Sequence, residues 1–251
     1  MKSLRNALMC ETGVPNGSFQ RDLLSPPPDI STTRANASLR DFLFWLEQPH
    51  IRLQFRLADP SMWTIWFQTW LDKTVWSTRD IFTEKNKAIG IGRCSWQLVA
   101  NAPKKWLRVC GFSAGTTKPN NTLASIDFDA MVSTYGESTP AHLRVYLLPS
   151  LYSAGVTAAV PTKPGDQLGT IGLQVGGQQC NGNANWDVGS WALLGKVLAH
   201  EIGHALGLNH VDVEGNLMTQ GSPASAVDLA PQQIDILRYL APNQCLLESV
   251  E

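Results

Sequence analysis

Eleven consecutive residues, HEIGHALGLNH from His200 to His210, constrain this chain more than any other stretch. They hold three of its five histidines, one glutamate and two glycines. The preceding residues, SWALLGKVL, carry apolar side chains at helical spacing, with Asp187 or Ser190 as the expected cap. His200 and His204 would then lie one turn apart on one helix face, about 6 Å apart along the axis. Their ring nitrogens could converge on a zinc ion at about 2.0–2.1 Å.

The other notable residues of this stretch, Glu201, Gly207 and His210, each have a physical reason for their position. Glu201 is rotated by about 100° from His200 around the helix, so it borders the expected metal and could take a proton from a water molecule there. His210 would lie about 9 Å beyond His204 if the helix continued, so the chain must turn back. Gly207 stands at that point, since glycine ends helices in the left-handed conformation. A packing role alone would explain the helix-spaced pair of histidines, but not the adjoining glutamate, the glycine and the third histidine together.

The pattern H-E-x-x-H-x-x-G-x-x-H resembles the complete zinc signature of the metzincin metallopeptidases. Those enzymes also have a methionine in a tight turn after the third histidine, and here Met218 follows in EGNLMTQG. The resemblance implies that Met218 lies beneath the zinc as an apolar floor without binding it. There are two departures. Gln220 stands where some relatives have a tyrosine that contacts the metal, and Val211 differs from the residue that the commonest subfamilies have there.

The resemblance also implies the fold. We expect an α+β, metzincin-like zincin fold with a twisted, mostly parallel sheet, an active-site helix and a small C-terminal subdomain. Residues 41–251 would form the catalytic domain, divided into an upper subdomain at 41–207 and a short, matrixin-like lower one at 208–251. The lower part would end in the helix LAPQQIDILRYL, with Pro231 in its first turn. Residues 169–175, GTIGLQV, are the expected sheet edge that holds an extended substrate.

Apolar patterns predict further elements of the upper part. Strands are expected at residues 51–58 and in AIGIGRCSWQLVA, WLRVCGF and HLRVYLLPSL. One helix face is indicated by the spacing of five large side chains, which are Trp63, Trp66, Phe67, Trp70 and Leu71. We interpret this stripe as facing the core rather than binding sugar or membrane.

The N-terminal residues and the cysteines leave alternatives open. Residues 1–40 contain SPPPDISTTRANAS, which predicts a flexible leader or pro-like segment. Cys10 begins CETGVP, similar to the cysteine latch of matrixin proenzymes, but two extra residues favour chance. No C-x-x-C pair exists among the five cysteines. Cys94 and Cys110 would face each other in a hairpin centred on NAPKK, as a disulfide or as two buried thiols.

Composition excludes several classes of protein. The formal net charge is −1, from 20 basic and 21 acidic residues, which does not favour nucleic acid as a partner. No apolar run approaches the roughly 18 residues that span a bilayer. No secretory signal is recognised at the N-terminus, so localisation stays open. The family resemblance favours a secreted protein, for which a leaderless route is one alternative. We expect a monomer.

Together these features predict a zinc-dependent endopeptidase that acts on an extended protein or peptide. His200, His204 and His210 would bind Zn²⁺, and Glu201 would be the general base. His50 and His142 are not required. Two alternatives stay open, namely a toxin-like protease selective for one host protein and a catalytically silent zinc-binding module. The intact Glu201 does not favour the silent module.

Calcium is a further cofactor to consider. It would need oxygen ligands from several loops, for which Asp127, Asp129 and Asp187 are available. Ordinary loop acids are the preferred interpretation of these residues.

Overall fold

The computed structural model describes residues 50–57, 65–98, 108–109, 121–135, 143–158, 169–175, 191–221 and 223–241. The expected leader at 1–40, Cys10, Cys110, His142, and the cap candidates Asp187 and Ser190 lie outside these ranges. Within them, no helix has both the length and the apolar character needed to cross a membrane.

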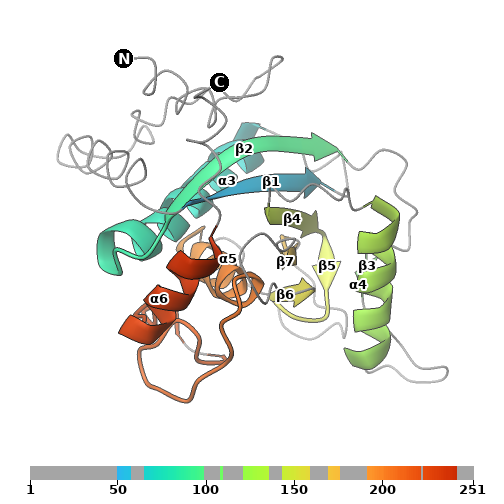
Figure 1. Ribbon diagram of the computed structural model, residues 1–251. Helices are drawn as coiled ribbons and strands as arrows, with labels where there is room; N and C mark the ends of the chain where they lie inside the picture. The colour runs from blue at the N-terminus through green and yellow to red at the C-terminus, as the bar shows by residue number, and fades with distance from the viewer. Residues whose placement is uncertain are drawn as a thin grey trace, which may run out of the picture.

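A five-stranded sheet in the order β2-β1-β4-β7-β6 lies at the centre of the fold (Figure 1). Four strands are parallel: β1 (His50–Leu57), β2 (Gly90–Leu98), β4 (Leu143–Leu148) and β7 (Thr170–Gln174). The fifth strand, β6 (Gly155–Ala158), is antiparallel to β7 and ends the order. A separate parallel pair consists of β3 (Arg108–Val109) and β5 (Ser150–Leu151).

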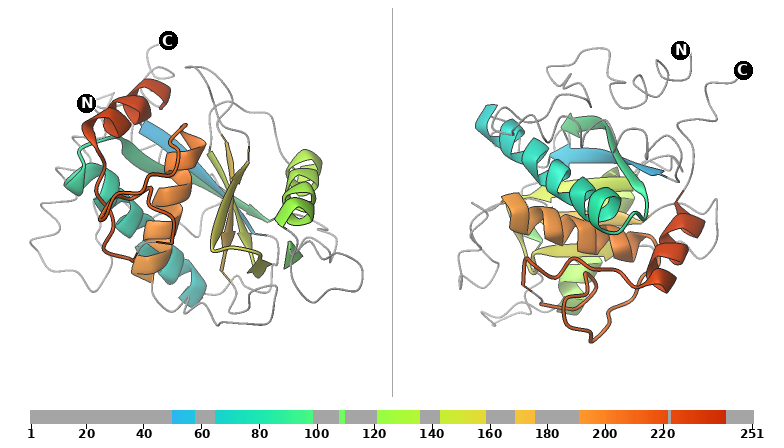
Figure 2. Two further views of the ribbon diagram at one scale, coloured as in Figure 1. Left: turned by 90° about the horizontal axis from the view of Figure 1, so that it is seen from below. Right: turned by 90° about the vertical axis from the view of Figure 1, so that its left-hand side faces the viewer.

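Helices cover both faces of the sheet. One face carries α3 (Ile65–Arg79) and α5 (Trp191–Ala205), and α3 continues into a π-helical segment, η2 (Asp80–Lys85). The opposite face carries α4 (Asn121–Tyr135), as the left view of Figure 2 shows. The last helix, α6 (Pro231–Leu240), starts at the expected proline and follows a long connection from α5. The result is the expected α+β architecture with a mostly parallel sheet.

The strands divide their side chains between two apolar clusters, because successive residues point to opposite faces. Val145 and Leu147 of β4 belong to the main core with α3 and α5, whereas Tyr146 and Leu148 pack with Phe128 of α4. The predicted helix face is confirmed where it is described, since its members at 67, 70 and 71 are buried in the main core. Trp63 and the side chain of Trp66 are outside the described residues.

Two expectations about elements are corrected by the structure. Residues 169–175 are not a sheet edge, because β7 lies between β4 and β6. The hairpin between the strands of Cys94 and Cys110 is also wrong, since β2 pairs with β1 and β3 pairs with β5. The helix α4 was not expected, and its residues explain why. Among its residues 126–134, only Phe128 and Met131 are buried, and Asp127 and Asp129 are exposed, so the apolar pattern of the described part is weak.

Candidate metal centre and active site

The helix that carries the first two histidines ends where the sequence predicted. Gly207 has a φ of 86°, the left-handed conformation that ends helices. The amide of Gly207 donates to the carbonyl of His204 at 2.9 Å, and the amide of Leu208 donates to that of Gly203 at 2.9 Å. These two bonds form a Schellman motif, which turns the chain back and lets His210 approach the helix from outside.

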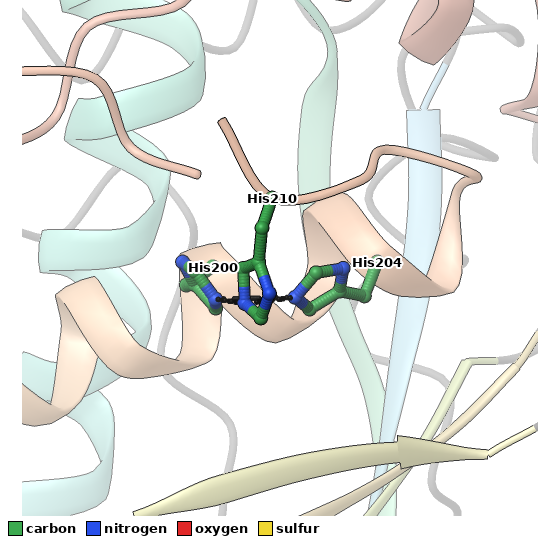
Figure 3. Close-up of side chains that lie close together, drawn as sticks. All are labelled: His200, His204 and His210. Atoms are coloured by element: carbon green, nitrogen blue, oxygen red, sulfur yellow. Dashed lines mark hydrogen bonds between the residues drawn. The ribbon is translucent and has the colours of Figure 1, made fainter. Parts of the chain in front are cut away.

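The three histidines meet at a single point (Figure 3). The Nε2 atom of His204 is 3.1 Å from that of His200 and 3.1 Å from that of His210, and the His200 and His210 nitrogens are 3.2 Å apart. Nitrogens bound to tetrahedral zinc at about 2.0–2.1 Å lie about 3.3 Å from one another. The nearly equilateral triangle therefore has the size that a zinc ion requires.

Backbone carbonyls set the protonation of two of the rings. The Nδ1 atom of His200 is 2.7 Å from the carbonyl oxygen of Leu217, and that of His204 is 2.7 Å from the carbonyl oxygen of Leu208. A carbonyl oxygen only accepts, so each Nδ1 carries the proton and each Nε2 keeps its lone pair. Two lone pairs 3.1 Å apart repel each other, and a cation between them removes that repulsion.

Burial also keeps these rings neutral. It lowers the pKa of His200 to about 4, with the nearby charges of His204, Lys196 and His210 acting in the same direction. Burial likewise lowers the pKa of His204. Neutral imidazole is the form that binds metals, so the two rings are ready to act as ligands at neutral pH.

Glu201 lies against the edge strand β6. Its side chain is only 7% exposed, and burial raises its pKa to about 7, while the Thr157 hydroxyl and the Lys196 ammonium act to lower it. Thr157 Oγ1 donates to Glu201 Oε2 at 2.7 Å. A Cβ atom at Gly155 would lie 2.5 Å from Glu201 Cγ. Sequence reasoning missed Thr157 and Gly155, because a four-residue strand carries no recognisable motif.

Met218 lies beneath the same helix. Its side chain is fully buried, and a Cβ atom at Gly203 would lie 2.5 Å from its sulfur. Its amide donates to Asn216 Oδ1 at 2.8 Å, and Asn216 Nδ2 donates in turn to Gln233 Oε1 of α6 at 2.8 Å. The methionine turn thus packs against Gly203, which lies between His200 and His204, and is connected to α6 through hydrogen bonds.

Of the remaining candidates, those that the structure describes do not belong to this centre. Among the described residues, His200, His204 and His210 form the one group of at least three His, Cys, Asp or Glu side chains close enough to share an ion. Asp127 and Asp129 are exposed on α4, and Asp187 is not described. Calcium binding therefore stays untested.

Comparisons with known proteins agree with the motif. The Matrixin family model matches residues 158–237, about a third of the chain, which contain the histidines, Glu201 and Met218. No curated protein matches.

Several solved structures match the chain at low identity and with TM-scores below 0.5. Metalloproteinase-II from Bacteroides fragilis is 12% identical with a TM-score of 0.46, over 81% of this chain and 54% of that one. This chain therefore spans about half the length of that protein. Archaemetzincin from Methanopyrus kandleri is 13% identical with a TM-score of 0.40, over 80% and 93%. A zinc-dependent peptidase from Methanocorpusculum labreanum is 15% identical with a TM-score of 0.38, over 79% and 99%.

The zinc signature, the helix break and the methionine turn thus coincide with the segment that the Matrixin model matches. Over residues 158–237, the chain is therefore similar to the Matrixin family, and this segment includes the three histidines, Glu201 and Met218.

Proposed function

We propose that the chain is a zinc-dependent endopeptidase. The observation that carries the proposal has two parts. The Nε2 atoms of the three histidines lie 3.1–3.2 Å apart, and Glu201, which follows His200 on α5, is buried. His200, His204 and His210 are the proposed ligands, and their neutral donor set fits zinc. When bound, zinc would polarise a carbonyl and lower the pKa of a water molecule toward about 7.

Glu201 is the proposed general base. A pKa of about 7 is close to the value at which a group both accepts and returns a proton efficiently near neutral pH. Its Oε2 atom accepts the Thr157 hydroxyl, whereas Oε1 accepts no hydrogen bond within the described part of the chain. Oε1 would accept the proton of the attacking water and then protonate the departing amine.

Strand β6 is the proposed docking edge for the substrate. It is the last strand in the order of the main sheet as described, and its residues Gly155 and Thr157 contact Glu201. A peptide that added to this edge would run beside the general base in extended form. Main-chain pairing of this kind fixes the direction of a peptide without reading its side chains, which supports cleavage within a chain.

The test is the substitution Glu201→Gln, which keeps the shape of the side chain and removes its basicity. We expect zinc to stay bound while casein hydrolysis falls by about 10²–10⁴-fold, the usual contribution of a general acid–base. His204→Ala is the matched control and should lose the metal, measured by elemental analysis. Zinc-loaded Glu201→Gln with wild-type activity would exclude Glu201 as the base.

A second measurement tests the activity itself. Zinc-loaded wild-type protein should cleave casein or a proteome-derived peptide library, and phenanthroline or a hydroxamate should block the cleavage. No cleavage of either substrate would contradict a general endopeptidase. Cleavage confined to one intact protein would instead favour a selective protease.

A further inference from the structure

We propose that Thr157 is a positioning residue for the general base, so that the edge strand β6 fixes the orientation of the Glu201 carboxylate. This inference rests on the proposed peptidase function. The Thr157 hydroxyl lies 2.7 Å from Glu201 Oε2 and 3.1 Å from the backbone carbonyl oxygen of Glu201. A single hydroxyl on β6 thus contacts both the main chain and the tip of the side chain of the same residue on α5.

A glutamate on a helix needs such a partner to be held in place. The helix fixes its Cα–Cβ bond, but the remaining torsions of the side chain stay free unless something binds the carboxylate. Threonine suits this role, because its β-branched side chain has few allowed rotamers and its hydroxyl is a well-oriented donor. Of its two acceptors, the carboxylate forms the stronger, charge-assisted bond.

Gly155 completes the arrangement by leaving space. A Cβ atom there would lie 2.5 Å from Glu201 Cγ and 2.7 Å from Oε1, so any larger residue would displace the carboxylate. Gly155 is not among the glycines with a positive φ, so the position needs room and not conformational freedom. Gly155 and Thr157 are two residues apart on one face of β6 and together enclose the side chain of Glu201.

The pairing of β6 decides which residues face the glutamate. Thr157 pairs with Ile171 of β7 and Gly155 pairs with Leu173, whereas Val156 and Ala158 pack in the apolar cluster around α4. A slip of β6 by one residue would turn Val156 toward α5 and move the hydroxyl to the other face. The antiparallel register of this short strand therefore positions the general base.

The experiment compares Thr157→Val, which is nearly isosteric, with Thr157→Ser, which keeps the hydroxyl. In the zinc-loaded protein, we expect kcat of Thr157→Val to fall by about tenfold to a hundredfold with KM within about twofold of wild type. Zinc content should not change, and Thr157→Ser should recover most of kcat. Thr83→Val is the control, since it removes a buried hydroxyl that is bonded to the Arg79 carbonyl, and it should leave kcat unchanged.

A second readout needs neither metal nor activity. In the metal-free protein, Thr157→Val should lower the urea midpoint when Glu201 is present and should lower it less in a Glu201→Ala background, because the bond to the carboxylate is already lost. Equal shifts in both backgrounds would show that the hydroxyl has no interaction with the carboxylate and would overturn the proposal.

Three further results would overturn it as well. These are wild-type kcat in Thr157→Val, loss of zinc in parallel with kcat, and failure of Thr157→Ser to recover kcat. A wild-type protein that cleaves nothing would instead refute the proposed peptidase function, while the urea comparison would still test the contact between Thr157 and Glu201.

Discussion

Close packing at single residues holds the candidate site in place. Gly203 is inside α5, where glycine costs about 1 kcal/mol relative to alanine, so its presence needs a reason. The reason is the fully buried Met218, whose sulfur would lie 2.5 Å from an added Cβ atom. Met218 is the neighbour of Leu217, whose carbonyl accepts from His200. The contact between Gly203 and Met218 therefore helps to set the orientation of a proposed ligand.

We expect Gly203→Ala to destabilise the protein, although alanine is the better helix former. Overpacking of a filled core costs about 1–3 kcal/mol, which exceeds the gain in helix propensity. Zinc affinity, measured by competition with a chelating dye, should fall too, because Met218 must shift. Gly195→Ala is the control in the same helix, since its Cβ would lie 2.5 Å from Ser77 Cβ and should reduce stability alone. A more stable Gly203→Ala would contradict the argument.

At the scale of elements, the end of α5 determines whether the third histidine can join the other two. The Schellman motif at Gly207 reverses the chain within three residues of His210. The helix, the break and the position of the third histidine could all be predicted from sequence, because each depends on local geometry. The strand β6 could not, since four residues give a weak pattern and only pairing with β7 decides which strand lies at the edge.

Gly207→Ala tests the importance of this helix end. A non-glycine residue in the left-handed conformation costs about 1–2 kcal/mol, so we expect a loss of stability of that order. Relief of the strain would move the segment that carries His210, and zinc affinity should therefore also fall. Gly221→Ala is the control, because Gly221 has a φ of 65° with no atoms within 4 Å of an added Cβ and follows the three histidines. Equal zinc affinities in the two variants would refute the coupling.

At the scale of the whole molecule, two side chains connect the C-terminal segment to the sheet domain. Asn86 Nδ2 donates to the carbonyls of Ile81 and Val227 at 2.7 and 2.8 Å, and its Oδ1 accepts from the amide of Leu229 at 2.8 Å. Arg238 of α6 donates from Nε to the carbonyl of Ala88 at 3.1 Å. Apart from the local bond to Ile81, these contacts join residues more than 140 positions apart in sequence. No pattern in the sequence could reveal them, and the division into subdomains at residue 207 stays a prediction.

Asn86→Ala should weaken this connection. It removes three hydrogen bonds and leaves partly buried backbone groups of Val227 and Leu229 without their partner, at a cost of about 1–3 kcal/mol. We expect a lower urea midpoint and faster hydrogen exchange at the Leu229 amide. Asn86→Asp retains the acceptor for Leu229 and should protect that amide better than alanine does. Unchanged exchange at Leu229 in Asn86→Ala would show that the bond contributes nothing.

At the candidate metal centre, the rings of His200 and His204 are held by hydrogen bonds to main-chain carbonyls, those of Leu217 and Leu208. Every amino acid carries the same acceptor, so no point mutation at either position can delete it. Substitutions at positions 208 and 217 are consequently limited by how well the new side chain fills its apolar site. Each imidazole keeps its proton on Nδ1 through any substitution that leaves the backbone in place.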